Sequence, residues 1–239
     1  MDIIWQGLKE GFLLILSLDP KIIEITLLSL KVSLSALFIA AIMGIPLGAI
    51  LALKEFPGRR TILNITYTFM GLPPVLAGLV VFIFLSASGP LGYFRLMFTP
   101  TAMVIAQVLL GFPIICGLTA RAVMAQPQEV FDTAATLGAS RRQAAWAIVR
   151  ESRMGIIAAL TTALGRLIAE VGAVTMVGGN IEGETRVLTT AIVLETRMGN
   201  DSTALAIGMV LLLIAFLIML IILRLEKRAF KDERRIQIV

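Results

Sequence analysis

Long apolar runs without a charged residue divide this chain and limit what it can fold into. Four such runs are residues 32–53, 61–94, 96–120 and 202–223, and a fifth, residues 154–178, is interrupted only by Arg166 and Glu170. About 20 apolar residues cross the hydrocarbon core of a membrane as one helix. A turn signal at residues 86–92 predicts that the second helix ends near Leu85. We therefore expect an all-α, polytopic membrane protein with about five transmembrane helices.

The composition agrees with a chain whose surface faces lipid. Hydrophobic residues form 58% of the sequence, mean hydropathy is +0.93, and only 15% of residues are charged. The net charge of +5 favours anionic lipid headgroups, and no basic stretch with interleaved aromatics points to nucleic acid. Histidine is absent and Cys116 is the single cysteine, which excludes an internal disulfide and argues against an intramembrane metalloprotease.

Lys and Arg are unevenly divided between the loops. Fourteen of the 21 lie in residues 54–60, in residues 121–153 and in the tail from Arg224, whereas six lie in the alternate set of loops. Cationic loops stay cytoplasmic, so the N-terminus is expected outside and the C-terminus inside, in a multi-pass protein of the cell membrane.

Apolar residues also recur at helical spacing before the first span, at Trp5, Leu8, Phe12 and Ile15. This spacing predicts a helix that lies in the membrane interface. The expected organisation is an interfacial helix in residues 1–23, a transmembrane domain in residues 24–224 and a cytoplasmic tail in residues 225–239.

The cytoplasmic loop in residues 122–153 has its own pattern. Residues 127–137 read as a short helix that begins at a proline, has Glu129 in its first turn and ends at Gly138. Ser140 can cap a second helix that begins at Arg141. The pattern predicts two short helices joined at a glycine elbow. A solvated hairpin without a partner is the alternative reading of the same residues.

The segment Asp132-Thr-Ala-Ala-Thr-Leu-Gly-Ala-Ser resembles the EAA signature of ABC importer permeases. In that family the segment forms the coupling helix, which docks into an ATPase subunit. The resemblance implies an ATPase-coupling role for Glu129, Asp132, Ala134, Ala135, Gly138, Ala139 and Ser140. The chain departs from the pattern by having Asp132 in place of the leading Glu, and by lacking the prolines that commonly follow the second helix, around residues 151–155.

Two further segments narrow the resemblance. Residues 71–78, Gly-Leu-Pro-Pro-Val-Leu-Ala-Gly, are similar to the double-proline segment of molybdate, sulfate and tungstate permeases. Residues 165–181 and 185–196 look most like the tungstate branch. The resemblance implies a type I importer permease that moves an oxyanion, with tungstate favoured and molybdate or sulfate left open. It also implies a homodimer, two ATPase subunits that bind ATP-Mg, an extracytoplasmic binding protein, and no cofactor on this chain.

Candidate pathway or gate residues lie near interruptions of the apolar runs. They are Pro73, Pro74, Val75, Gly78, Arg166, Glu170 and Asn180. Each proline removes a backbone donor, so the second span must kink or unwind there, either as a plain kink or as part of a gate.

Arg166 and Glu170 lie four residues apart, so on a continuous helix they would share one face. They are either a buried structural ion pair or residues that assist passage of a dianion.

Two other classes of protein fit less well. A self-contained secondary transporter or channel commonly has coupling carboxylates within its spans and an inverted repeat, but only Glu170 is available and no repeat is visible. An intramembrane enzyme would need a clustered catalytic set, which is not apparent. The chain also has no Gly-x-x-x-x-Gly-Lys-Ser/Thr motif, so we expect a non-catalytic subunit whose energy comes from a separate ATPase.

Overall fold

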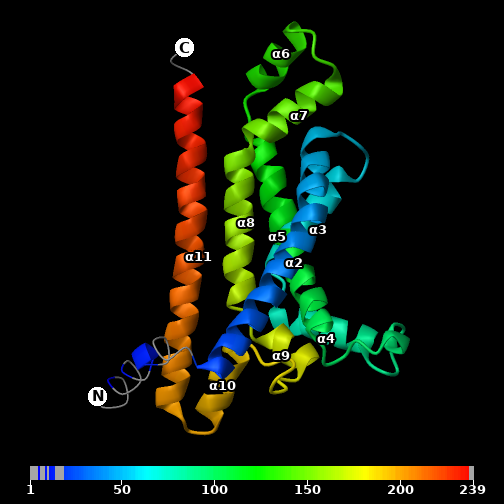
Figure 1. The fold of residues 1–239 in the computed structure, drawn as a ribbon. Coiled ribbons are helices and arrows are strands. Elements are labelled where there is room, and N and C mark those ends of the chain that lie inside the picture. Colours follow the sequence, from blue (N-terminus) through cyan, green and yellow to red (C-terminus); the bar gives the residue numbers. More distant parts are fainter. Residues whose placement is uncertain (1–4, 6–8, 10, 14–18, 237–239) are drawn as a thin grey trace. The chain divides into compact units, whose positions relative to one another are not determined.

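The structure is a computed structural model that describes residues 5, 9, 11–13 and 19–236. The described residues contain helices and no strands (Figure 1). In chain order the elements are α2 (Pro20–Leu53), α3 (Arg59–Met70), α4 (Pro74–Leu85), η1 (Gly92–Phe94), α5 (Pro100–Met124), α6 (Gln128–Thr136), α7 (Arg141–Glu151), α8 (Arg153–Ile168), α9 (Gly172–Gly178), α10 (Leu188–Arg197) and α11 (Asp201–Ile236). The proposed interfacial helix in residues 1–23 falls largely outside the described residues, as do Leu8 and Ile15.

Five stretches of the described chain are long and apolar enough to span a membrane, if each bent helix pair counts as one span. Helices α2, α5 and the part of α11 up to residue 222 are continuous. The pairs α3 with α4 and α8 with α9 are bent by 105° and 57° at short breaks. This pattern agrees with the predicted all-α membrane domain of about five spans, whereas the orientation of its ends stays a prediction.

Two helices are longer than the apolar runs indicated. Helix α2 begins at Pro20, because Oδ1 of Asp19 accepts hydrogen bonds from the first free backbone amides, those of Lys21 at 2.8 Å and Ile22 at 3.4 Å. Helix α11 continues to Ile236 through the segment expected to be a separate tail. Residues 223–236 contain no Gly or Pro and many Lys, Glu and Arg, which favour a helix.

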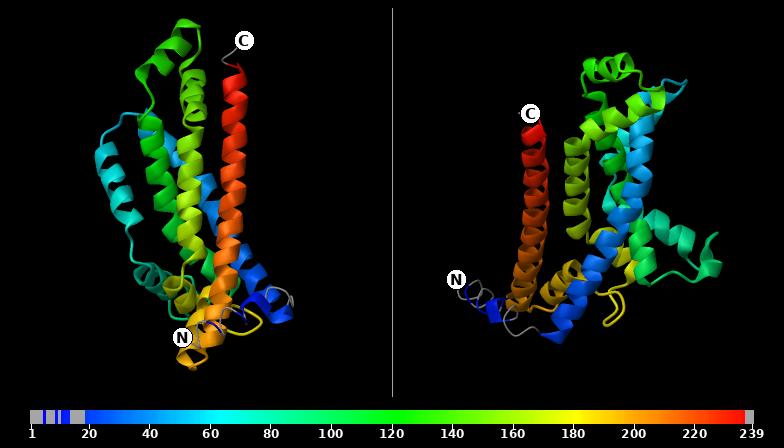
Figure 2. Two further views of the ribbon diagram at one scale, coloured as in Figure 1. Left: turned by 90° about the vertical axis from the view of Figure 1, so that its left-hand side faces the viewer. Right: turned by 45° about the horizontal axis from the view of Figure 1, so that its top comes forward.

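The chain forms two compact units, and α2, α5 and α8 each contribute residues to both. Unit 1 holds the described residues up to 36, residues 73–107 and the chain from 165 onward. In it α10 packs along the start of α11 (Figure 2), and α4 packs on α9. Leu188, Ala191, Ile207 and Val210 form a buried apolar cluster between α10 and α11.

Unit 2 holds residues 37–72 and 108–164. One buried cluster joins Ala40, Ile114, Ile115 and Ala163, and a second joins Leu51, Leu63, Cys116 and Ala120. The side chain of Cys116 therefore packs in a buried apolar core. Gly48 lets α2 approach α5 closely, because a Cβ at this position would lie 2.5 Å from the carbonyl oxygen of Cys116.

Candidate functional site

The loop after α5 folds as the predicted pair of helices with a glycine elbow (Figure 1). Gly138 has φ +80°, a left-handed conformation that favours glycine. Its N–H donates to Ala135 O at 3.0 Å, and the N–H of Ala139 donates to Ala134 O at 3.0 Å. This pair of bonds is the Schellman motif, which closes the end of a helix. Ala134, Ala135 and Ala139 thus contribute to the elbow through their backbone groups.

Helix α7 begins at the predicted cap. The backbone N–H of Ser140 donates to Oε1 of Gln143 at 2.8 Å, and the N–H of Gln143 donates to Ser140 Oγ at 3.4 Å. This reciprocal arrangement is a capping box. Gln143 was not among the predicted site residues, although the spacing Ser-x-x-Gln in the sequence is the signal that identifies it.

The elbow hairpin, residues 127–151, presents side chains that its own fold leaves uncovered. No residue of α6 is buried, and Glu129 and Asp132 are exposed. Leu137 is 83% exposed and Trp146 is 70% exposed. The hairpin thus exposes two large apolar side chains and two carboxylates, a combination suited to contact with another protein.

The double proline separates α3 from α4 completely. At the end of α3, Gly71 and Leu72 donate hydrogen bonds to Thr68 O and Phe69 O. Pro73 is extended, with φ −61° and ψ 127°, and Pro74 is the first residue of α4, a position where its missing N–H is not needed. The predicted kink or unwinding is therefore a full break.

Val75 and Gly78 follow this break but differ in their surroundings. Val75 is 56% exposed. Gly78 is buried against α9, where a Cβ would lie 2.7 Å from the Cα of Ala173. Among the candidate gate residues, Gly78 therefore contributes close helix packing between α4 and α9.

The second break separates α8 from α9. Leu167 O, near the end of α8, accepts hydrogen bonds from Gln107 Nε2 at 3.0 Å, from Ser33 Oγ at 3.5 Å and from the N–H of Glu170 at 3.3 Å. Thr189 Oγ1 donates to Glu170 O at 2.8 Å. Side chains from three other helices thus bond to backbone carbonyls that the broken helix leaves free. Ser33, Gln107 and Thr189 were missed in the sequence, since nothing local in it indicates these distant partners.

Arg166 and Glu170 do not share a helix face, because α8 ends at Ile168. Glu170 is buried, and its Oε1 accepts a hydrogen bond from the N–H of Ala173 at 2.9 Å, at the start of α9. Among the described residues no ion pair joins Arg166 to Glu170, and Arg166 is exposed. The break therefore gives the two charged groups different environments.

The loop after α9 makes a tight turn around Asn180. Gly179 and Asn180 both have positive φ, at 73° and 53°. Thr185 Oγ1, which is fully buried, donates to Gly178 O at 2.6 Å and accepts from the N–H of Ile181 at 2.9 Å. Oδ1 of Asn180 is buried without a hydrogen-bond partner in the described part of the chain. Helix α10 follows this turn.

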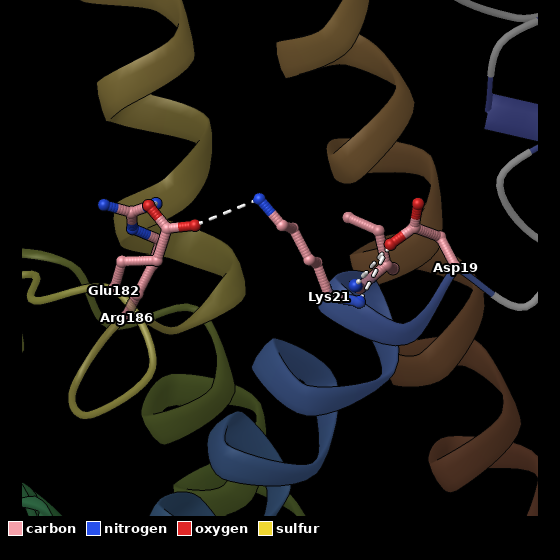
Figure 3. A network of polar contacts seen from close by, with 5 residues as sticks. Asp19, Lys21, Glu182 and Arg186 are labelled. Atoms are coloured by element: carbon pink, nitrogen blue, oxygen red, sulfur yellow. Dashed lines mark hydrogen bonds and ion pairs between the residues drawn. The ribbon is translucent and has the colours of Figure 1, made fainter.

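An ion-pair network ties the start of α2 to the same loop (Figure 3). Glu182 accepts from Lys21 Nζ at 3.3 Å and from Arg186 Nη1 at 3.1 Å. The hydrogen bond from Lys21, its positive charge and that of Arg186 lower the pKa of Glu182. Lys21 and Glu182 are exposed to solvent, so the ion pair between them contributes little to stability.

Within the described residues, no group of three or more His, Cys, Asp or Glu side chains could hold a metal ion.

The candidate functional site consists of two parts, the elbow hairpin in unit 2 and the polar break between α8 and α9 in unit 1.

Known proteins are similar to this chain in both sequence and fold. Residues 44–231 match the family described as "Binding-protein-dependent transport system inner membrane component". The tungstate uptake system permease protein TupB of Peptoclostridium acidaminophilum is 42% identical over 95% of this chain and 100% of its own length. The protein of the same name from Campylobacter jejuni is 34% identical over 95% of each chain.

Among solved structures, a chain of the inward-facing MetNI methionine ABC transporter has a TM-score of 0.71, with 18% sequence identity over 87% of this chain and 95% of that chain. This likeness confirms the predicted ABC importer permease fold. The family match spans most of the chain, from within α2 to within α11. The chain belongs to the family of binding-protein-dependent transport system inner membrane components.

Proposed function

We propose that this chain is the permease subunit of an ATP-driven importer that moves tungstate into the cell. The observation that carries the proposal is the 42% identity to a tungstate uptake permease over 95% of this chain. Molybdate and sulfate are related tetrahedral dianions and form the competing substrates. In such a system the binding protein selects the anion, and the permease provides its route across the membrane.

The elbow hairpin is the proposed docking site for a separate ATPase subunit. Its backbone is braced by the Schellman motif at Gly138 and by the capping box at Ser140. A hairpin held in this way transmits a displacement without first changing its own conformation. The exposed side chains of Leu137 and Asp132 supply an apolar anchor and a negative charge for the ATPase surface. One hairpin per chain suits one ATPase per chain.

Arg166 is the proposed electrostatic aid to anion passage. An exposed guanidinium without a carboxylate partner lowers the barrier for a dianion more than a paired one does. The separation of Arg166 from Glu170 at the end of α8 favours this role over that of a structural ion pair. Glu170, which is buried and bonded to the backbone of Ala173, has the structural role.

The complete transporter is proposed as a homodimer of this chain, with two ATPase subunits on the cytoplasmic side and a binding protein outside. A chain of 239 residues is small for enclosing a pathway alone, and two copies provide two halves. ATP binding closes the ATPase pair, moves the hairpins together and opens the pathway outward to accept the anion. ATP hydrolysis returns the dimer to its inward-open state.

A charge reversal on the hairpin tests this function. In Asp132→Lys, co-purification of the ATPase and tungstate uptake should both fall, while the amount of permease in the membrane stays unchanged. Glu184→Lys is the matched control, because Glu184 is also an exposed acid but lies in the loop before α10. Normal uptake with the ATPase still bound in Asp132→Lys would contradict the coupling role. Uptake inhibited by sulfate or molybdate as strongly as by unlabelled tungstate would contradict the assigned substrate.

A further inference from the structure

A small cavity lies in unit 1 beside the break between α8 and α9. The volume open to the centre of a water-sized sphere is about 10 Å³. Helices α2, α5, α8, α10 and α11 contribute to the lining. Four of the lining side chains are polar and more than nine-tenths buried, with exposed fractions of 4% for Ser33, 3% for Gln107, 5% for Glu170 and 6% for Thr189. A polar cavity within an apolar membrane domain calls for a polar occupant.

The amide of Gln107 has a defined orientation. Its Nε2 donates to Leu167 O at 3.0 Å, and because a carbonyl oxygen only accepts, the amide nitrogen must face it. Oε1 of Gln107 is therefore turned away from Leu167. This oxygen is buried, and no described residue donates a hydrogen bond to it. A buried amide oxygen is rarely left without a donor.

The neighbouring hydroxyl groups already use their protons elsewhere. Ser33 Oγ donates to Leu167 O, Thr189 Oγ1 donates to Glu170 O, and Ser29 Oγ donates to Ile25 O. The Glu170 carboxylate accepts one bond, from the N–H of Ala173, and has lone pairs left for more. Among the described residues the cavity therefore offers acceptors from two side chains, and these hydroxyl groups have no spare proton for them. The amide nitrogen of Gln107 has a second N–H, but this group cannot reach the oxygen of its own amide.

We propose that this cavity binds one water molecule, which donates one hydrogen bond to Oε1 of Gln107 and the other to the Glu170 carboxylate. A water supplies one donor to each of these two acceptors. The size agrees, since a cavity of roughly 10–15 Å³ by this measure holds one water. The water links α5 to the residue between α8 and α9, in addition to the direct bond from Gln107 to Leu167 O. This site concerns how the broken span is held and does not depend on which anion the transporter moves.

A density map of the purified transporter, at a resolution that shows ordered waters, tests the proposal. The expected result is one peak about 2.5–3.0 Å from both Gln107 Oε1 and a Glu170 carboxylate oxygen. In Gln107→Met the peak should vanish. In Thr119→Val it should remain, because Thr119 is a fully buried residue of the same helix, also with an unpartnered oxygen, that does not line this cavity.

If a variant does not fold, the density map of the wild-type protein alone decides the question. An empty cavity would overturn the proposal. So would a peak with shorter distances to several oxygens that appears only in sodium-containing buffer, because that peak would be a bound cation.

Discussion

Replacing Gly138 tests whether the shape of the elbow hairpin carries the coupling. A residue with a side chain in the left-handed conformation costs about 1–2 kcal/mol. A Cβ at Gly138 would meet nothing within 4 Å, so this backbone cost is the whole penalty in Gly138→Ala. It lowers the ratio of ordered to disordered elbow roughly 5- to 30-fold. Gly138→Asn should lose less, because Asn adopts this conformation more readily than Ala.

Gly138→Pro is the stronger change. Proline fixes φ near −65° and cannot adopt the observed φ of +80°. It also removes the N–H that donates to Ala135 O, a bond that contributes about 1 kcal/mol. The elbow should not form, and tungstate uptake should be lost although the permease is still inserted in the membrane.

Three measurements check this prediction: amide hydrogen exchange in α6, retention of the ATPase during purification, and tungstate uptake. Exchange should accelerate and retention should fall in the order Asn, Ala, Pro. Gly199→Ala is the matched control, because Gly199 has φ +79°, has no neighbour within 4 Å and lies between α10 and α11. It imposes the same backbone cost and should leave ATPase retention unchanged. Full uptake and a bound ATPase in Gly138→Pro would refute the assignment of the hairpin.

Three other expectations follow from the breaks and loops. Arg166→Met should stay folded but transport poorly, and Glu170→Gln should transport at least as well as wild type; uptake and thermal unfolding check both, and normal uptake in Arg166→Met would end its role in anion passage. Gly78→Ala should destabilise the protein by about 1–3 kcal/mol, because the added methyl group has no room against α9; an unchanged unfolding midpoint would show that the helices separate easily. In a cysteine-free background, an impermeant thiol reagent added to intact cells should label a cysteine at position 184 but not one at position 140, and the reverse pattern would invert the orientation.

The helix ends that were predictable from the sequence have local signals. Pro73 with Pro74 marked the break in the second span, and Gly138 with Ser140 marked both sides of the elbow. Each depends on the conformational limits of one residue type within a few positions of the chain. Such features need no knowledge of tertiary contacts.

The break at the end of α8 had no such signal. Residues 165–178 contain no proline, and the spacing of Arg166 and Glu170 indicated a continuous helix. Where the helix ends, side chains that are distant in sequence, from Ser33 and Gln107, bond to Leu167 O. Interactions across 60 and 134 residues are not visible in a local pattern. The same limit explains why Gln107 was absent from the predicted site.

ATP-driven tungstate uptake into proteoliposomes tests the central claim most directly. The vesicles would contain this permease with its ATPase, with the binding protein added outside and ATP enclosed. We expect tungstate to accumulate only when ATP, the ATPase and the binding protein are all present, and a sodium or proton gradient to have no effect. Accumulation driven by an ion gradient in vesicles that contain this chain alone would contradict the claim and would identify a self-contained secondary transporter.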